Sequence, residues 1–220
     1  MPQVSHLAPR DQILEASATL FVDEGFAGTS TRDIAELVGI RQASLYYHFA
    51  GKDGILAELL QQSVRPSLDK VERIEAECPA EVPEAALYLL ALIDVHTLAR
   101  APQNIGKLYR MPDVMKLEIY QQFRASLKAL TKAYGRLGAR IASEPVAATT
   151  STNQLGGILI QLTETVIKSR ADNHKIRPAE THALATSCLR ACGVPQDRIE
   201  VAAATATDLM PRFIEEQHAQ

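Results

Sequence analysis

Residues 29–52 read TSTRDIAELVGIRQASLYYHFAGK and contain the signals of two short helices separated by a tight turn. Ser30 is a typical N-cap residue, and Asp33 follows it at the spacing of a capping box. Apolar residues then recur at helical spacing as far as Gly39, which suits the left-handed position that ends a helix. The next segment, 42–49, is apolar on one side and polar on the other. The stretch therefore predicts a helix-turn-helix, in which the second helix enters the major groove of DNA.

The composition of the whole chain favours helices over strands. Of the 220 residues, 46% are hydrophobic, only 5% are aromatic, and tryptophan is absent. Alanine and leucine are abundant and glycines are few, which is typical of helical proteins. We therefore expect an all-α protein with a substantial core, arranged as one or two domains.

The cellular location follows from what the chain lacks. No apolar run approaches the roughly 20 residues that a membrane-spanning helix needs. The N-terminal residues do not contain the apolar core of a signal peptide. The three cysteines, Cys78, Cys188 and Cys192, are too few and too odd in number for a secreted disulfide framework. We expect a cytoplasmic protein with reduced thiols and no membrane partner.

The charge of the chain does not by itself indicate a nucleic-acid-binding protein. The formal net charge is −3, and residues 1–63 contain four basic and eight acidic side chains. The basic groups are nevertheless well placed, because Arg32, Arg41, His48 and Lys52 all fall within the helix-turn-helix stretch. Few charged contacts imply a weak dependence of affinity on salt, so specific binding would need two copies of the domain.

An N-terminal helix is expected to complete the DNA-binding domain. Pro9 suits the first turn of a helix, and apolar residues recur on one face until Gly25 ends it. This helix would pack across the helix-turn-helix and give it a three-helix core. A fourth helix is expected from Lys52 to the region of Pro66, where proline should end or kink it, and this helix would link the domain to the rest of the chain.

The remaining sequence predicts a larger helical domain. The expected domains are 1–65 and 66–220, with roughly nine or ten helices in total. Pro83 suits the start of an apolar central helix, and Pro112 suits the start of a long helix of about eight turns. The small residues of 143–157 leave three structures open: a loop, a loosely formed helix start, or a helix face that another helix approaches closely.

Three segments of the N-terminal region together resemble the TetR/AcrR-like family of transcriptional regulators. They are LFVDEGF at 20–26, TSTRDIAELVGI at 29–40 and ASLYYHFAGKDGIL at 43–56, so the resemblance covers about residues 8–60. LYYHF followed closely by GK is far more specific than a general helix-turn-helix pattern. The resemblance implies a homodimer that binds a palindromic DNA operator and releases it when a small-molecule effector enters the C-terminal domain. It thus indicates a ligand-responsive repressor without a cofactor.

The resemblance also assigns the side chains that would contact DNA. Gln42 would pair with adenine, and Arg41 would take guanine or a phosphate. Tyr46, Tyr47 and Lys52 would reach the phosphates beside the groove. The full expected set is Ser30, Thr31, Arg32, Arg41, Gln42, Ala43, Ser44, Tyr46, Tyr47, His48 and Lys52.

Other interpretations of these residues remain open at the level of sequence. Arg32 has the spacing to pair with Glu36 on the surface of its own helix. Tyr46 or Tyr47 could pack against a neighbouring helix with only its hydroxyl exposed. Arg41 occupies a turn position where similar proteins often carry a small hydroxyl residue, so it could alter the helix cap, the base preference, or both.

The second domain is expected to hold the effector site and the dimer interface. The effector cavity would be lined by aromatic, apolar and basic side chains of the central helix, the following short element and the long helix. The candidates are Tyr88, Leu92, His96, Tyr109, Arg110, Met115, Tyr120 and Phe123. The dimer would use small and apolar residues of two helices, namely Gly156, Gly157, Ile160, Ala203, Ala206 and Met210.

The sequence contains no recognised catalytic motif. A G-x-S-x-G elbow, a P-loop, an H-E-x-x-H and a glycine-rich dinucleotide turn are all missing, so we expect no catalytic residues and no metal site. Cys188 and Cys192, one helical turn apart with His182 nearby, keep a metal or redox site open, although unreactive thiols are favoured. The acidic N-terminal region keeps a rival function open, a helical small-molecule-binding protein whose helix-turn-helix is not functional.

Overall fold

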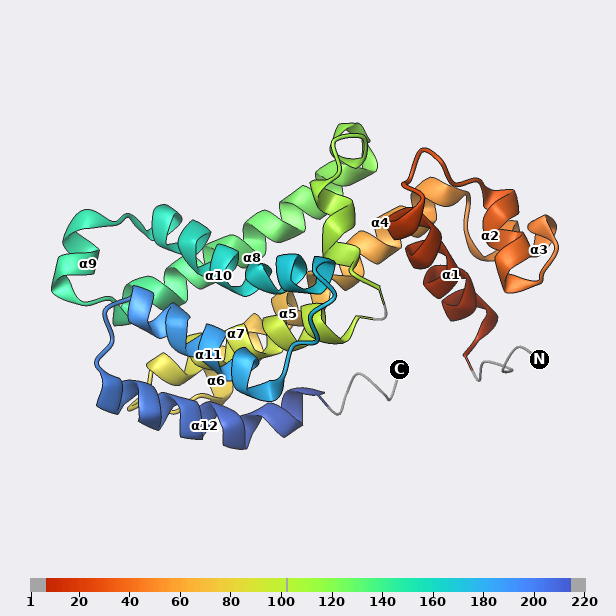
Figure 1. Cartoon of the computed structure of the whole chain (residues 1–220). Coiled ribbons are helices and arrows are strands. Elements are labelled where there is room, and N and C mark those ends of the chain that lie inside the picture. Colours follow the sequence, from red (N-terminus) through yellow and green to blue (C-terminus); the bar gives the residue numbers. More distant parts are fainter. Residues whose placement is uncertain (1–6, 102, 215–220) are drawn as a thin grey trace. The chain divides into compact units, whose positions relative to one another are not determined.

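The computed structural model describes residues 7–101 and 103–214, and these residues form helices and no strands. The all-α prediction is therefore confirmed. The chain divides into two compact units (Figure 1). The first unit contains Met1–Ser63 and Ala101–Arg124, and the second contains Val64–Arg100 and Ala125–Gln220. This division assigns Ala101–Arg124 to the unit of the N-terminal helices. The domains expected from the sequence, 1–65 and 66–220, instead place that segment in the second domain.

The first unit is built on a three-helix core. Helix α1 packs against α2 and α4, and α2 packs against α3. Their apolar sides meet in a core that includes Ile13, Phe21, Ile34 and Leu45, all fully buried. The elements of this unit are α1 (Pro9–Asp23), α2 (Thr31–Val38), α3 (Gln42–His48), α4 (Lys52–Gln62), η1 (Ile105–Arg110), η2 (Val114–Lys116) and the start of α8 (Ile119–Ile141).

The local signals in the sequence place the ends of these helices. The Ser30 side chain accepts a hydrogen bond from the Asp33 backbone, and the Asp33 carboxylate accepts one from the Ser30 backbone, which completes the capping box. Gly39 ends α2 with φ 77° and Gly25 follows α1 with φ 84°, a conformation that glycine adopts without strain. The turn between α2 and α3 is therefore encoded within a few residues.

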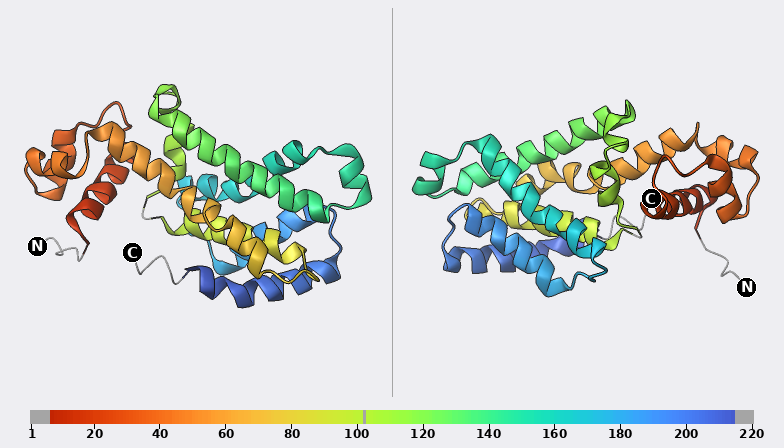
Figure 2. Two further views of the ribbon diagram at one scale, coloured as in Figure 1. Left: turned by 180° about the vertical axis from the view of Figure 1, so that it is seen from behind. Right: turned by 45° about the horizontal axis from the view of Figure 1, so that its top comes forward.

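The second unit surrounds helix α7. This helix is buried on nearly all sides and packs against α10, α11 and α12, which are the cyan to blue helices of Figure 2. Arg198 of α12 fastens that helix to α7 with two hydrogen bonds to the Glu84 carboxylate, of 3.0 and 2.8 Å. The other elements of the unit are α5 (Arg65–Leu68), α6 (Val71–Glu77), α7 (Glu84–Arg100), the rest of α8, α9 (Glu144–Thr149), α10 (Thr152–Ala171), α11 (Pro178–Ala191) and α12 (Gln196–Ile214).

A fully buried carboxylate joins four helices in the core of this unit. Asp94 of α7 accepts hydrogen bonds from Ser67, Tyr134 and Thr163, at 2.9, 3.0 and 3.0 Å. These partners belong to α5, α8 and α10. Burial raises the pKa of Asp94 to about 6, although the three hydroxyl groups act in the opposite direction.

Helices α8 and α10 approach each other closely through glycine. A Cβ atom at Gly156 would collide with the backbone oxygen of Thr131, and one at Gly135 would collide with the backbone oxygen of Thr152. The small residues of 143–157 thus combine two of the structures that the sequence left open, a helix start and a closely approached helix face. They form α9, the start of α10, and a helix face that α8 approaches, and Ser151 begins α10 with a second capping box.

Two expectations about helices need correction. The long helix begins at Ile119 and not at Pro112, because Leu117 adopts an extended conformation (φ −73°, ψ 145°) after the single turn η2 and interrupts the helix. The sequence predicted nine or ten helices, whereas the described residues contain the α-helices α1 to α12. The difference arises because α5, α6 and α9 form as short separate helices.

Among the described residues, no helix combines the length and the apolar character that crossing a bilayer requires.

Candidate nucleic-acid interface

Helix α3 is anchored by apolar side chains on one side and exposed on the other. Leu45 is fully buried and Phe49 is 7% exposed, so these two residues hold the helix against the core of the first unit. Tyr46 and Tyr47 are 51% and 87% exposed, which excludes the alternative that either one is buried. The residues that the sequence assigned to DNA lie on this open side, namely Arg41, Gln42, Ala43, Ser44, Tyr46 and Tyr47.

The start of α3 is tied to the start of α2 by side chains. Gln42 donates a hydrogen bond of 2.8 Å from Nε2 to Oγ1 of Thr31. The Thr31 hydroxyl also lies 3.3 Å from the Tyr46 hydroxyl. Three side chains that the sequence placed at the DNA surface therefore form one exposed network, and the Gln42 amide is held in a defined orientation.

The Arg41 side chain remains available for an external partner. Its backbone is extended at the N-cap of α3 (φ −74°, ψ 144°), and its side chain does not cap the helix. Within the described residues, no hydrogen bond or ion pair involves its guanidinium. The unusual arginine of the turn is therefore compatible with the helix start, and its charge is exposed to solvent.

Lys52 points into the domain and not outward. Its Nζ donates hydrogen bonds to the backbone oxygens of Phe26 and Thr29, at 2.9 and 3.0 Å, and lies 4.4 Å from the centre of the Phe26 ring. These contacts fasten the loop between α1 and α2 to the start of α4. Two of the three N–H donors of the ammonium group are thus used inside the unit, so the expected phosphate contact would rely on the third.

Ser30, Arg32 and His48 differ in their availability. The Ser30 hydroxyl donates to Asp33 at 2.7 Å and accepts from its backbone, so the cap occupies it. The same hydroxyl lowers the pKa of the Asp33 carboxyl. Arg32 is exposed, and the alternative ion pair with Glu36 does not form. His48 is partly buried, and its ring stacks edge-to-face on Tyr47 at 5.1 Å.

These contacts reduce the charge that the first unit can offer to DNA. Arg10 is paired with Glu58 at 3.2 Å and lies over the Phe49 ring. Lys52 is directed inward. Among the described residues of 7–63, Arg32 and Arg41 remain as the cations without an internal ion pair or hydrogen bond. This arrangement agrees with the weak dependence of DNA affinity on salt that the sequence predicts.

The second unit contains a cavity of about 300 Å³ between α7, α11 and α12. Two of the expected effector residues, Leu92 and His96, line it. Tyr88 lies deeper and is 1% exposed, with its hydroxyl 3.2 Å from Nδ1 of His182. The sequence missed His182 as a cavity residue, and also α11 and α12 as walls, because no local pattern shows which distant helices will meet α7.

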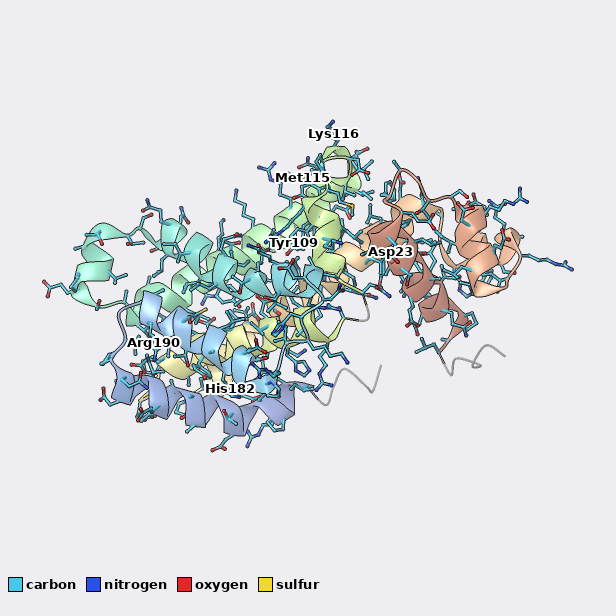
Figure 3. All side chains as sticks on the ribbon, viewed as in Figure 1. Asp23, Tyr109, Met115, Lys116, His182 and Arg190 are labelled. Atoms are coloured by element: carbon cyan, nitrogen blue, oxygen red, sulfur yellow. The ribbon has the colours of Figure 1, made fainter. Side chains whose placement is uncertain are left out.

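The other five expected effector residues belong to the first unit. Tyr109 of η1 stacks on Phe123 at 4.9 Å, and Phe123 contacts the Tyr120 ring at 5.6 Å. Met115, labelled with Tyr109 in Figure 3, is 49% exposed, and Arg110 is also exposed. The three aromatic rings pack on one another, and none of the five residues lines the cavity between α7, α11 and α12.

The expected dimer residues fall into two groups. Gly156, Ile160 and Ala206 are buried within the subunit, so they are not available to a partner, and their assignment is corrected. Their small or apolar side chains serve packing inside the chain. Gly157, Ala203 and Met210 are partly exposed, and Gly157 lies beside Ile158, which is 48% exposed on the outer side of α10.

Cys188 of α11 and Cys192, directly after that helix, are buried thiols. Burial raises the pKa of Cys188 to about 12 and that of Cys192 to about 11, so both are protonated at neutral pH and poorly reactive. His182 is directed to Tyr88 and not to these thiols.

The sequence and the fold have close counterparts among bacterial regulators. A family model described as bacterial regulatory proteins, tetR family, matches residues 13–59. The crystal structure of AmtR from Mycobacterium smegmatis is similar over nearly the whole chain, with a TM-score of 0.81 and 34% sequence identity. The similarity covers 95% of this chain and 98% of that chain.

Two repressors match over a short segment alone. The HTH-type transcriptional repressor KstR2 of Mycolicibacterium smegmatis is 44% identical over 52 residues, and the negative regulator IcaR of the Staphylococcus aureus biofilm operon is 42% identical over 65 residues. The matched segments cover 24% and 30% of this chain. They span only 25% and 33% of the two repressors, respectively.

Proposed function

The chain belongs to the tetR family of bacterial regulatory proteins, and we propose that it is a homodimeric transcriptional repressor that binds a palindromic DNA operator and releases it when a small molecule binds. The observation that carries the proposal is the exposed side of α3, which presents Arg41, Gln42 and Ser44 at the start of a helix held from behind by Leu45.

Base recognition is assigned to Gln42 and Arg41. A glutamine amide pairs with adenine through N6 and N7, and an arginine guanidinium pairs with guanine through O6 and N7. Thr31 holds the Gln42 amide by one N–H, which leaves Oε1 and the second N–H for the base. Ala43 and Ser44, on the same exposed turn, would meet a thymine methyl group and a phosphate or base edge.

Contacts to the DNA backbone are assigned to groups beside this turn. Tyr46 and Tyr47 carry exposed hydroxyl groups, and Arg32 carries an exposed charge. Such contacts fix the position of the protein on DNA and do not select sequence. Lys52 supports the arrangement from inside the unit by holding the loop before α2.

Dimerisation is assigned to the outer side of α10. A shallow hollow there is lined by Gly157, Ile158 and Leu162 with polar neighbours, and Ile158 is a large apolar side chain exposed on the subunit surface. Burial of such a surface against a second copy supplies the apolar contact that homodimers use. Two recognition helices about one DNA turn apart, roughly 34 Å, would then read adjacent major grooves.

Regulation is assigned to a shift between two arrangements of the dimer. One arrangement has the spacing of the two recognition helices that DNA requires, and the other does not. A ligand with higher affinity for the second arrangement would shift the population of dimers away from DNA. A cytoplasmic location belongs to the same proposal, since the operator and metabolites are both found there.

Selection of bound sequences from random duplex DNA tests the proposal. We expect enrichment of an inverted repeat at low salt, and a Gln42→Ala variant that alters base preference within each half-site. If no inverted repeat is enriched, the rival function gains support, a helical small-molecule-binding protein with a non-functional helix-turn-helix. A sedimentation measurement on the same samples establishes whether the bound species is a dimer.

A further inference from the structure

The cavity between α7, α11 and α12 has a mixed lining. Most of its wall is apolar and includes Leu92, Met210 and Ile214. Its size, about 300 Å³, is at the lower end of the range for small-molecule sites, so it suits a compact ligand. The lining residues all belong to the second unit, where the walls come from segments distant in sequence.

The polar part of the lining contains His96, Arg100 and His182 together with Thr181 and Thr207. His96 and Arg100 are four residues apart on α7 and therefore share one face of the helix. Burial, together with the nearby charges of Arg100 and Lys70, lowers the pKa of His96 and so favours its neutral imidazole. The lining contains no Asp or Glu side chain, and Arg100 forms no ion pair with another described residue. The cavity thus has one permanent positive charge without a counter-ion in the described chain.

The opposite wall contributes a fixed imidazole. His182 of α11, labelled in Figure 3, lies with Nδ1 3.2 Å from the Tyr88 hydroxyl. The same hydroxyl lies 3.3 Å from the His182 backbone oxygen and 3.4 Å from the Thr186 hydroxyl. Because Nδ1 is engaged, Nε2 is the nitrogen left for a ligand. The cavity therefore combines one guanidinium, two imidazoles and an apolar wall.

We propose that this cavity binds a compact apolar carboxylate, with the carboxylate against Arg100 and the apolar part against Leu92, Met210 and Ile214. An arginine binds a carboxylate with two parallel hydrogen bonds and keeps its charge at any physiological pH. His96 and His182 add hydrogen bonds at the same end of the ligand. The assignment of the ligand as the effector rests on the proposed function, but the binding itself does not.

Binding of octanoate to the full-length protein without DNA tests this site. Octanol serves as the neutral probe of the same chain length. We expect octanoate to raise the melting temperature and to bind at least about ten-fold more tightly than octanol, because only the carboxylate pairs with Arg100. Equal affinity for the two probes would overturn the proposal.

The NMR resonances of the methionine methyl groups can show where octanoate binds. The chain has four methionines, of which Met210 lines the cavity and Met115 lies exposed in the first unit. With ¹³C-methyl methionine, octanoate should shift the Met210 resonance and leave that of Met115 in place. A shift of the Met115 resonance without a shift of the Met210 resonance would place the ligand outside the cavity and contradict the proposal.

A pair of arginine variants tests the charge. Arg100→Met should weaken octanoate binding about ten-fold and leave octanol binding unchanged. Arg190→Met is the matched control, since Arg190 lies on α11 outside the cavity and contacts Gln196. If both variants bind octanoate like the parent protein, Arg100 does not hold the carboxylate and the proposal is wrong.

The proposed function is tested separately from this site. Octanoate is added to the complex of the protein with its selected inverted repeat, and DNA release is measured. Release that Arg100→Met abolishes supports both proposals. Octanoate binding without release supports the site and counts against its role as the effector site, whereas DNA binding without any octanoate affinity overturns the site alone.

Discussion

Thr31 Oγ1 accepts a hydrogen bond of 2.8 Å from Nε2 of Gln42, which joins the first residue of α2 to the first residue of α3. The bond uses one N–H of the amide and orients the rest of it. The remaining donor and acceptor have the pattern that complements adenine in the major groove. In the proposed complex, Thr31 of α2 would thereby orient the base-contacting amide of Gln42 before DNA is present.

Thr31→Val should reduce the affinity for an adenine-containing operator. Loss of the hydroxyl removes a hydrogen bond of about 0.5–1.5 kcal/mol, which corresponds to roughly 2–13-fold in affinity. Fluorescence anisotropy with the selected operator measures the change. The double variant with Gln42→Ala should bind like Gln42→Ala alone, because Thr31 acts through that amide. Additive losses would show that Thr31 contacts DNA independently.

Lys52→Met should destabilise the protein more than it changes DNA contacts. The variant loses two charge-assisted hydrogen bonds to Phe26 and Thr29 and the cation–π contact, with an expected cost of about 2–3 kcal/mol in the free energy of unfolding. Urea denaturation measures this loss of stability. Arg41→Met is the control, since its side chain has no partner in the described residues. We expect Arg41→Met to unfold like the parent protein and to bind DNA more weakly, and the reverse order would contradict both assignments.

Asp94 should make the second unit less stable as the pH rises. Its pKa is about 6 in the folded protein against 3.8 ordinarily, so the folded state binds the proton more tightly. The contribution is complete below pH 4 and is lost as the pH rises through about 6. Asp94→Asn removes this titration. The stability of Asp94→Asn relative to the parent protein should therefore increase by roughly 2 kcal/mol between pH 4 and pH 7. Urea denaturation across that range measures the difference, and a constant difference would show that Asp94 keeps its ordinary pKa.

Adjacent glycines of α10 should respond oppositely to alanine. Gly156→Ala places a methyl group against the backbone of α8 and should cost about 1–3 kcal/mol by overpacking. Gly157→Ala meets nothing within 4 Å and should stabilise the helix by about 0.5–1 kcal/mol. Thermal or urea unfolding of each variant measures its change in stability relative to the parent protein. Equal effects would mean that α8 and α10 do not cross at Gly156.

Patterns within a few residues were sufficient to predict the helix-turn-helix. The capping box of Ser30 and Asp33, the left-handed Gly39 and the apolar spacing around Leu45 depend on neighbours in the chain, so they can be read directly from the sequence. The exposure of the tyrosines of α3 could not be read in this way, because a single helix does not show which helix will cover it.

The sequence by itself determined the all-α class, the family and the reading helix, because these depend on local signals and composition. Tertiary structure alone decided that Lys52 turns inward to Phe26 and Thr29, which lie 26 and 23 positions earlier in the chain. It also decided that α11 and α12 line a cavity with α7. It also buried Gly156 against α8, although its spacing suggested a partner subunit. The physical reason is common to all three. A side chain's partner across the fold is selected by the packing of whole helices, and that packing depends on many residues at once.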